Sequence, residues 1–188
     1  MSSTKHEDRT NLVKNSRIDL DSHDNVVILG KCSCVANYTG NTVQVHPVSL
    51  DHEAFKVPIV DAVIHYDDPY SGESYLLVCK EALFVAAMTH NLIPPFLMRE
   101  AGLVVDDVPK VQSTNPTMQH HSMHFPEDNL RIPLRQCEIF SCFPSSKPSL
   151  HVLNDNNVKC LFLTIGLIDP HSKTYGEKER SMLHHEAT

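Results

Sequence analysis

Short runs of apolar, often β-branched residues, separated by turn-forming residues, set the hydrophobic pattern of the chain. Two such runs, 59–66 and 74–79, flank 67–73, a segment rich in Asp, Pro and Gly. This pattern predicts a β-hairpin. A second hairpin is predicted around Thr39-Gly40-Asn41, because alternating residues lie on both sides of a Gly-Asn turn. Further strands are predicted at 26–29, 82–85, 103–105, 130–134 and 158–167.

One helix is predicted at 94–102, where two prolines stand at the start and Gly102 follows the last turn. Proline is favoured in the first turn of a helix and glycine just past its end. The segments 109–124 and 144–157 combine polar residues with proline, so we expect loops there. About seven to nine short strands and one short helix indicate a mainly β fold, either a barrel or a sandwich.

The pattern also divides the chain of 188 residues into regions. Residues 1–16 are polar without periodicity, which predicts a disordered leader. A β domain is expected at 17–110, and a loop-rich extension at 111–157. Pro133 lacks a backbone donor, so the strand in that extension is expected at a sheet edge. A strand and a polar tail are expected at 158–188.

Composition indicates which kinds of partner the chain is not expected to bind. The formal net charge is −7, and no long run of Lys or Arg is present. Binding of nucleic acid by this segment is therefore not expected, because such binding depends on a positive field. No stretch reaches the roughly 18 consecutive apolar residues of a membrane span, so no membrane contact is expected.

Cysteine usage bears on the compartment. The first seven residues carry no hydrophobic leader, so no secretory signal is expected. We expect reduced thiols and a cytoplasmic, intracellular location. The six cysteines are Cys32, Cys34, Cys79, Cys137, Cys142 and Cys160.

Two groupings contain residue types that bind metals: His120-His121-x-x-His124 and Cys32-x-Cys34. A structural zinc site needs four ligands in paired short spacings, and no second matched pair is present. We therefore expect solvated histidines and no metal, with a zinc-binding loop as the remote alternative. Glycine-rich phosphate loops are absent from the sequence, so no nucleotide cofactor is expected either.

The segment Asp21-Ser22-His23-Asp24 stands between two strand-like runs and has two possible explanations. Asp and Ser favour turns for local hydrogen-bonding reasons, so it can be an ordinary turn. A carboxylate on such a turn can also be one half of an acid/base dyad. Adjacent Ser22, His23 and Asp24 cannot form a hydrolase triad by themselves, because triad groups converge from separate positions.

Over residues 18–183 the chain resembles the protease region of copia-type retrotransposon polyproteins. The similarity is closest to a divergent subgroup whose protease motif reads Asp-Ser-His-Ala-Asp-Thr. Single motifs are short, but their order along the chain is specific. The matching segments are Leu20–Gly30, Tyr38–Gly40, Val57–Ala62, Tyr66–Tyr75, Asn91–Gly102, Val104–Pro109, Phe125–Leu134 and Asp169–Glu179.

This resemblance implies a retropepsin-like fold, a small β barrel with one short helix and a β-containing C-terminal extension. It implies a homodimer that acts on polypeptide substrates, with Asp21 as the aspartate of the dyad followed by Ser22. The segment 91–97 would supply the apolar strand and helix that support the active-site loop.

Two departures from the motif bear on activity. His23 stands where retropepsins have glycine, and one residue fewer separates His23 from Asp24 than in the related elements. Glycine lets the backbone form a tight turn close to the carboxylate, whereas histidine adds bulk and a titrating charge. We therefore expect a polyprotein fragment with a degenerate aspartic-protease-like domain. The alternative is an active homodimeric aspartic endopeptidase that processes its own polyprotein.

Overall fold

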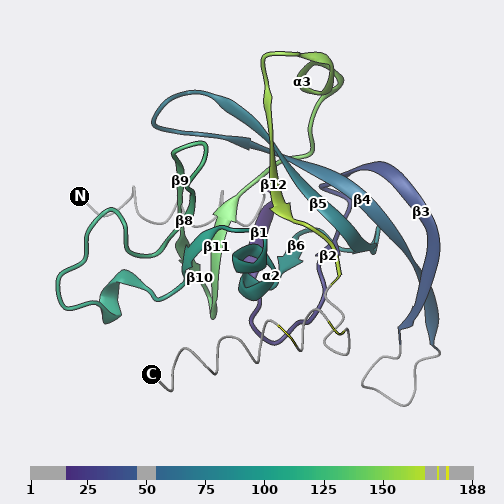
Figure 1. Ribbon diagram of the computed structural model, residues 1–188, viewed down its shortest axis with the longest axis horizontal. Coiled ribbons are helices and arrows are strands. Elements are labelled where there is room, and N and C mark those ends of the chain that lie inside the picture. The colour runs from purple at the N-terminus through teal and green to yellow at the C-terminus, as the bar shows by residue number, and fades with distance from the viewer. Residues whose placement is uncertain (1–15, 46–53, 168–172, 174–176, 178–188) are drawn as a thin grey trace, which may run out of the picture.

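The computed structural model describes residues 16–45 and 54–167, together with 173 and 177. These residues form a nine-stranded mixed sheet and a separate three-stranded antiparallel sheet. Figure 1 shows the long strands β3 and β4 curving along one side of the molecule, with the smaller sheet on the other side. Residues 1–15 of the predicted leader lie outside the described residues, as does the polar end of the predicted tail apart from 173 and 177.

The large sheet has the strand order β10-β11-β1-β6-β2-β5-β4-β3, with β12 paired to another part of β5. The smaller sheet has the order β7-β8-β9. The strands are β1 (Arg17–Leu20), β2 (Ile28–Leu29), β3 (Cys34–Val45), β4 (Phe55–Asp67), β5 (Ser74–Phe84), β6 (Asn91–Ile93), β7 (Val104–Asp106), β8 (Ser122–Phe125), β9 (Leu130–Pro133), β10 (Arg135–Cys137), β11 (Phe140–Pro144) and β12 (Lys159–Thr164).

The hairpin predicted from 59–66 and 74–79 is present as β4 and β5, which pair antiparallel along most of their length. Asp68 shapes the turn between them. Its carboxylate accepts hydrogen bonds from the Tyr70 N–H at 3.1 Å and from the Ser71 hydroxyl at 2.7 Å. These local bonds explain why the Asp-Pro-Gly segment forms a turn here.

The predicted hairpin around Thr39-Gly40-Asn41 is wrong. Residues on both sides of Gly40 belong to the single long strand β3, which pairs with β4 throughout. The Gly-Asn signal instead marks an irregularity, because the register shifts between Tyr38 and Thr42 and Gly40 has φ 84°. Glycine tolerates such a backbone, so the chain bulges at this point without reversing direction.

The predicted helix is confirmed as α2 (Pro95–Glu100). Pro95 occupies the first turn, and Gly102 follows the end of the helix with φ 88°. A second helix, α3 (Leu150–Asn154), lies within a segment predicted to be a loop, so the expectation of one helix is wrong. Ser149 caps α3, since its side chain accepts from the Val152 N–H. The described residues also include the short 3₁₀ helix η1 (Lys110–Gln112).

The fold is mainly β, as predicted, but the sheets do not close into a barrel. Instead the two sheets share one apolar core. This core contains Leu20 of β1, Met123 of β8 and Leu163 of β12, all buried. Strands from 111–157 and 158–167 therefore pack on the same core as the N-terminal strands. The strand at 130–134 lies at an edge, as predicted from Pro133.

The expectation of six reduced thiols is wrong for one pair. Cys137 and Cys142 form a disulfide, with Cα atoms 5.9 Å apart. They stand on the neighbouring strands β10 and β11, which pair antiparallel. Cys32, Cys34, Cys79 and Cys160 are free.

Among the described residues, no helix has both the length and the apolar character needed to cross a membrane.

Candidate functional site

Asp21 stands at the end of a buried strand. β1 pairs antiparallel with β11 on one side and parallel with β6 on the other. Its residues Ile18 and Leu20 are buried in the core. The strand ends at Leu20, and the Asp21 N–H then donates to the Ile93 carbonyl at 3.2 Å. β6 therefore fixes the backbone position from which the Asp21 side chain emerges.

The turn that follows brings His23 back to Asp21. The His23 N–H donates to Asp21 Oδ1 at 2.9 Å, which makes an Asx-type turn. The imidazole Nδ1 of His23 lies 3.5 Å from the same oxygen and forms an ion pair with it when protonated. The Asp21 side chain is 16% exposed and that of His23 is 94% exposed. Ser22 is also exposed.

Asp24 is a second carboxyl group in the same turn, and it was not predicted as a site residue. Burial, reinforced by the charge of Asp21, raises the pKa of Asp24, while His23 opposes this shift. Asp24 Oδ2 is buried and has no hydrogen-bond partner. An unpartnered buried oxygen disfavours the charged form of a carboxyl group. The sequence signal that could have identified Asp24 was its spacing from Asp21, since two carboxylates three residues apart in one turn lie near each other.

Asp19 lies two residues before Asp21, on β1 itself. Its side chain is 1% exposed. The Arg17 Nε donates to Asp19 Oδ1 at 2.7 Å, and His90 Nε2 lies 3.6 Å from Oδ2. A buried carboxylate needs such a partner. The alternation of Arg and Asp in β1 was the sequence signal for this pair.

Asn91 ties β6 to the segment that follows β2. This side chain is completely buried, and its Oδ1 accepts from the Gly30 N–H at 2.9 Å. Gly30 has no space for a side chain, because an added Cβ would lie 2.4 Å from the Met88 carbonyl oxygen. The backbone of 88–91 is therefore pressed against Gly30. These contacts fix β6, and β6 in turn holds Asp21.

The three histidines near position 120 do not converge. His120 bonds within its own loop, with Nδ1 2.9 Å from Thr117 Oγ1. His121 is buried, so the expectation of solvated histidines is wrong for this residue, and His124 lies on β8. Cys32 donates through Sγ to the Thr89 carbonyl. Within the part of the chain that the structure describes, no group of three or more His, Cys, Asp or Glu side chains is arranged to hold a metal.

His121 belongs to a polar network that was not predicted. Its Nε2 lies 2.9 Å from Ser141 Oγ, and the Ser141 hydroxyl donates to the Asp107 carbonyl at 2.9 Å. His121 directly precedes β8 of the smaller sheet and Ser141 belongs to β11 of the large sheet, so the network links these two segments. Burial lowers the pKa of His121 despite the nearby carboxylates of Asp106 and Asp107. Burial therefore disfavours the protonated form of this imidazole.

Comparison with known proteins gives no match. No protein-family model, no curated protein and no solved structure is significantly similar to the chain.

Proposed function

We propose that this chain is an aspartic-protease-like module of a copia-type retrotransposon polyprotein that has lost proteolytic activity. One observation carries the proposal: Asp21 emerges from the end of β1 and is bonded to Ile93 of β6, which leads directly into α2. The resemblance implies this same combination, a carboxylate supported by a second apolar strand and a short helix. The open sheet is a departure from the closed barrel of a retropepsin.

The loss of activity follows from the position of His23. An aspartic dyad requires two carboxyl groups about 3 Å apart that share one proton. The His23 imidazole Nδ1 lies 3.5 Å from Asp21 Oδ1, at a position where glycine would place no side chain. In a homodimer each copy would bring one imidazole to the dyad. The two imidazole rings would stand next to the carboxyl groups that have to approach each other.

A second candidate function is an active homodimeric aspartic endopeptidase, and Asp24 is the observation that favours it. Its carboxyl group has a raised pKa and a buried oxygen without a partner beside Asp21. A carboxyl group that keeps its proton next to an ionised carboxylate can act as a general acid. Asp24 would then hold the proton that a retropepsin dyad shares between two chains.

Digestion of an unstructured protein such as α-casein separates the two candidates. The purified full chain, Asp21→Asn and Asp24→Asn are compared over mildly acidic to neutral pH, with and without pepstatin. Loss of activity predicts no pepstatin-sensitive products from any of the three proteins. The active candidate predicts products that disappear in Asp21→Asn. Cleavage that persists in Asp21→Asn would reject Asp21 as the catalytic group.

A further inference from the structure

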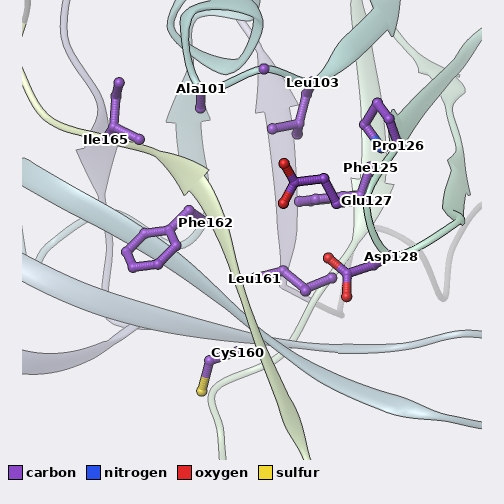
Figure 2. Close-up of a pocket in the computed structure, with 11 residues that line it drawn as sticks. Ala101, Leu103, Phe125, Pro126, Glu127, Asp128, Cys160, Leu161, Phe162 and Ile165 are labelled. Carbon is purple, nitrogen blue, oxygen red and sulfur yellow. The ribbon is translucent and has the colours of Figure 1, made fainter.

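A cavity of about 420 Å³ lies between the end of α2, the turn joining β8 to β9, and β12. Figure 2 shows Leu103, Phe125 and Leu161 around its middle. None of its lining residues belongs to β1 or to the turn that carries Asp21. Its volume suits one or two side chains of a bound molecule, since ligand pockets usually measure about 300–1,000 Å³. The cavity is therefore a potential site separate from the aspartate.

One wall of the cavity is the backbone edge of a strand. Within the described residues, β12 pairs with β5 on one side and with no strand on the other. Three consecutive residues of β12, 160–162, line the cavity. Successive side chains of a strand point to opposite faces, so a wall made of three in a row includes the strand edge itself. Unpaired N–H and C=O groups at such an edge can pair with an added strand.

This edge also carries exposed apolar side chains. Phe162 is 54% exposed and Ile165 is 61% exposed, and both line the cavity. Edge strands are usually protected by charged residues or proline, because an unprotected apolar edge associates with other strands. The exposed aromatic ring and the neighbouring cavity together favour an occupant with apolar side chains.

The opposite wall is acidic. Glu127 and Asp128 stand on the turn between β8 and β9, and Figure 2 shows their carboxylates directed toward β12. Lys159 Nζ lies 4.0 Å from Asp128 Oδ1, at the limit of an ion pair. Among the described residues, no cation lies within ion-pair distance of Glu127. A cationic side chain on the occupant would therefore complement this wall.

We propose that the cavity binds an extended peptide that adds a strand to the free edge of β12. The peptide places apolar side chains against Phe162 and Leu161 and an Arg or Lys between Glu127 and Asp128. Main-chain hydrogen bonds supply affinity in such strand addition, and the side-chain pockets supply specificity. A second copy of this chain is the poorer occupant, because the chain has a net charge of −7 and the site itself is acidic. The proposal does not depend on proteolysis.

Fluorescence anisotropy with a labelled Gly-Thr-Leu-Arg-Leu-Thr-Gly peptide tests this site on the full chain. The Arg peptide is expected to bind. Replacing its Arg with Glu is expected to weaken binding at least about tenfold, and so is N-methylation of its alternate backbone amides. The double variant Glu127→Gln, Asp128→Asn should weaken binding of the Arg peptide similarly. Glu138→Gln, an exposed carboxylate outside the cavity, serves as the matched control and should bind normally, as should Asp21→Asn.

Equal binding of the Arg and Glu peptides, or unchanged binding by the double variant, would overturn the proposal. Amide chemical shifts provide a second readout that does not depend on any variant folding. Binding of the Arg peptide should perturb the amides of Phe125, Glu127 and Asp128 and those of 160–165, and perturbations confined to other segments would count against the site. If the chain instead forms a dimer that Phe162→Thr dissociates, and the peptide does not bind, the edge of β12 serves self-association.

Discussion

The backbone N–H of Asp21 donates to the carbonyl oxygen of Ile93 at 3.2 Å, which joins the carboxylate-bearing turn to β6. Seventy-two positions separate these residues in the sequence. The turn is therefore held by the core and not by its own residues alone. A carboxyl group fixed in this way has a defined environment, and that environment can be measured by titration.

Asp24 provides the first prediction, because its neighbours shift its pKa in opposite directions. Asp21 raises the pKa of Asp24 and His23 lowers it, while burial raises it further. Asp21→Asn removes the like charge, so the pKa of Asp24 should fall. His23→Gly removes the cation, so the same pKa should rise. Carbon-13 NMR titration of the aspartate carboxyl groups measures both shifts. Shifts of the same sign in the two variants would refute this description of the turn.

The buried amide of Asn91 gives a prediction about stability. Asn91→Leu keeps a side chain of similar size but leaves the Gly30 N–H without its acceptor. An unsatisfied buried donor costs about 1–3 kcal/mol. The variant also removes Asn91 Nδ2, which is buried without a partner, so the free energy of unfolding should fall by less than that full cost. Urea denaturation measures it, with the exposed Asn25→Ala as control. Equal stability of both variants would show that the amide does not hold β6.

His121 predicts a pH dependence of stability. Burial lowers the pKa of its imidazole in the folded state, so the unfolded chain takes up the proton first as pH falls. The stability that His121 contributes is present above the ordinary histidine pKa of about 6.5 and is lost as pH drops below it. His121→Gln should lose less stability than the wild type between about pH 7.5 and about pH 5.5.

Urea midpoints at the two pH values measure this difference. Exposed His151, replaced by Gln, is the control and should follow the wild type. If His121→Gln and the wild type respond identically to pH, the buried imidazole is not the source of the effect.

The contact between Tyr66 and Phe143 predicts where the core is most sensitive. Their ring centroids lie 6.1 Å apart in an edge-to-face arrangement, and both side chains are buried. Phe143→Ala leaves a cavity and should lower the free energy of unfolding by about 3–5 kcal/mol. Phe55 is 45% exposed, so Phe55→Ala should cost much less. Thermal or urea unfolding compares them, and similar losses would place Phe143 outside the core.

The elements that could be predicted from the sequence are those with a strong local pattern. The hairpin β4–β5 and the helix α2 follow from alternation, turn residues and proline at the helix start. The long strand β3 could not be predicted, because Gly40 gives the same signal for a bulge as for a turn. Its pairing with β4 decides between the two. The capped helix α3 was missed because its five residues are too few to show a helical period.

The candidate site was predictable in part. The position of Asp21 at a strand end follows from the sequence, but its bond to Ile93 depends on tertiary pairing. The pairs Asp19–Arg17 and Asn91–Gly30 are buried contacts of polar residues, which hydrophobic patterns do not reveal. His121, which directly precedes β8, and Ser141 of β11 meet through tertiary packing, and nothing in their separation of 20 positions indicates this contact.

Substrate profiling with a diverse synthetic peptide mixture is the most direct test of whether Asp21 has lost proteolytic activity, because it presumes no cleavage specificity. Products made by the purified wild-type chain and by Asp21→Asn are compared by mass spectrometry from mildly acidic to neutral pH. A chain that has lost proteolytic activity should give the same background products as Asp21→Asn. Products that only the wild type makes, and that pepstatin suppresses, would contradict it and identify a working aspartic protease.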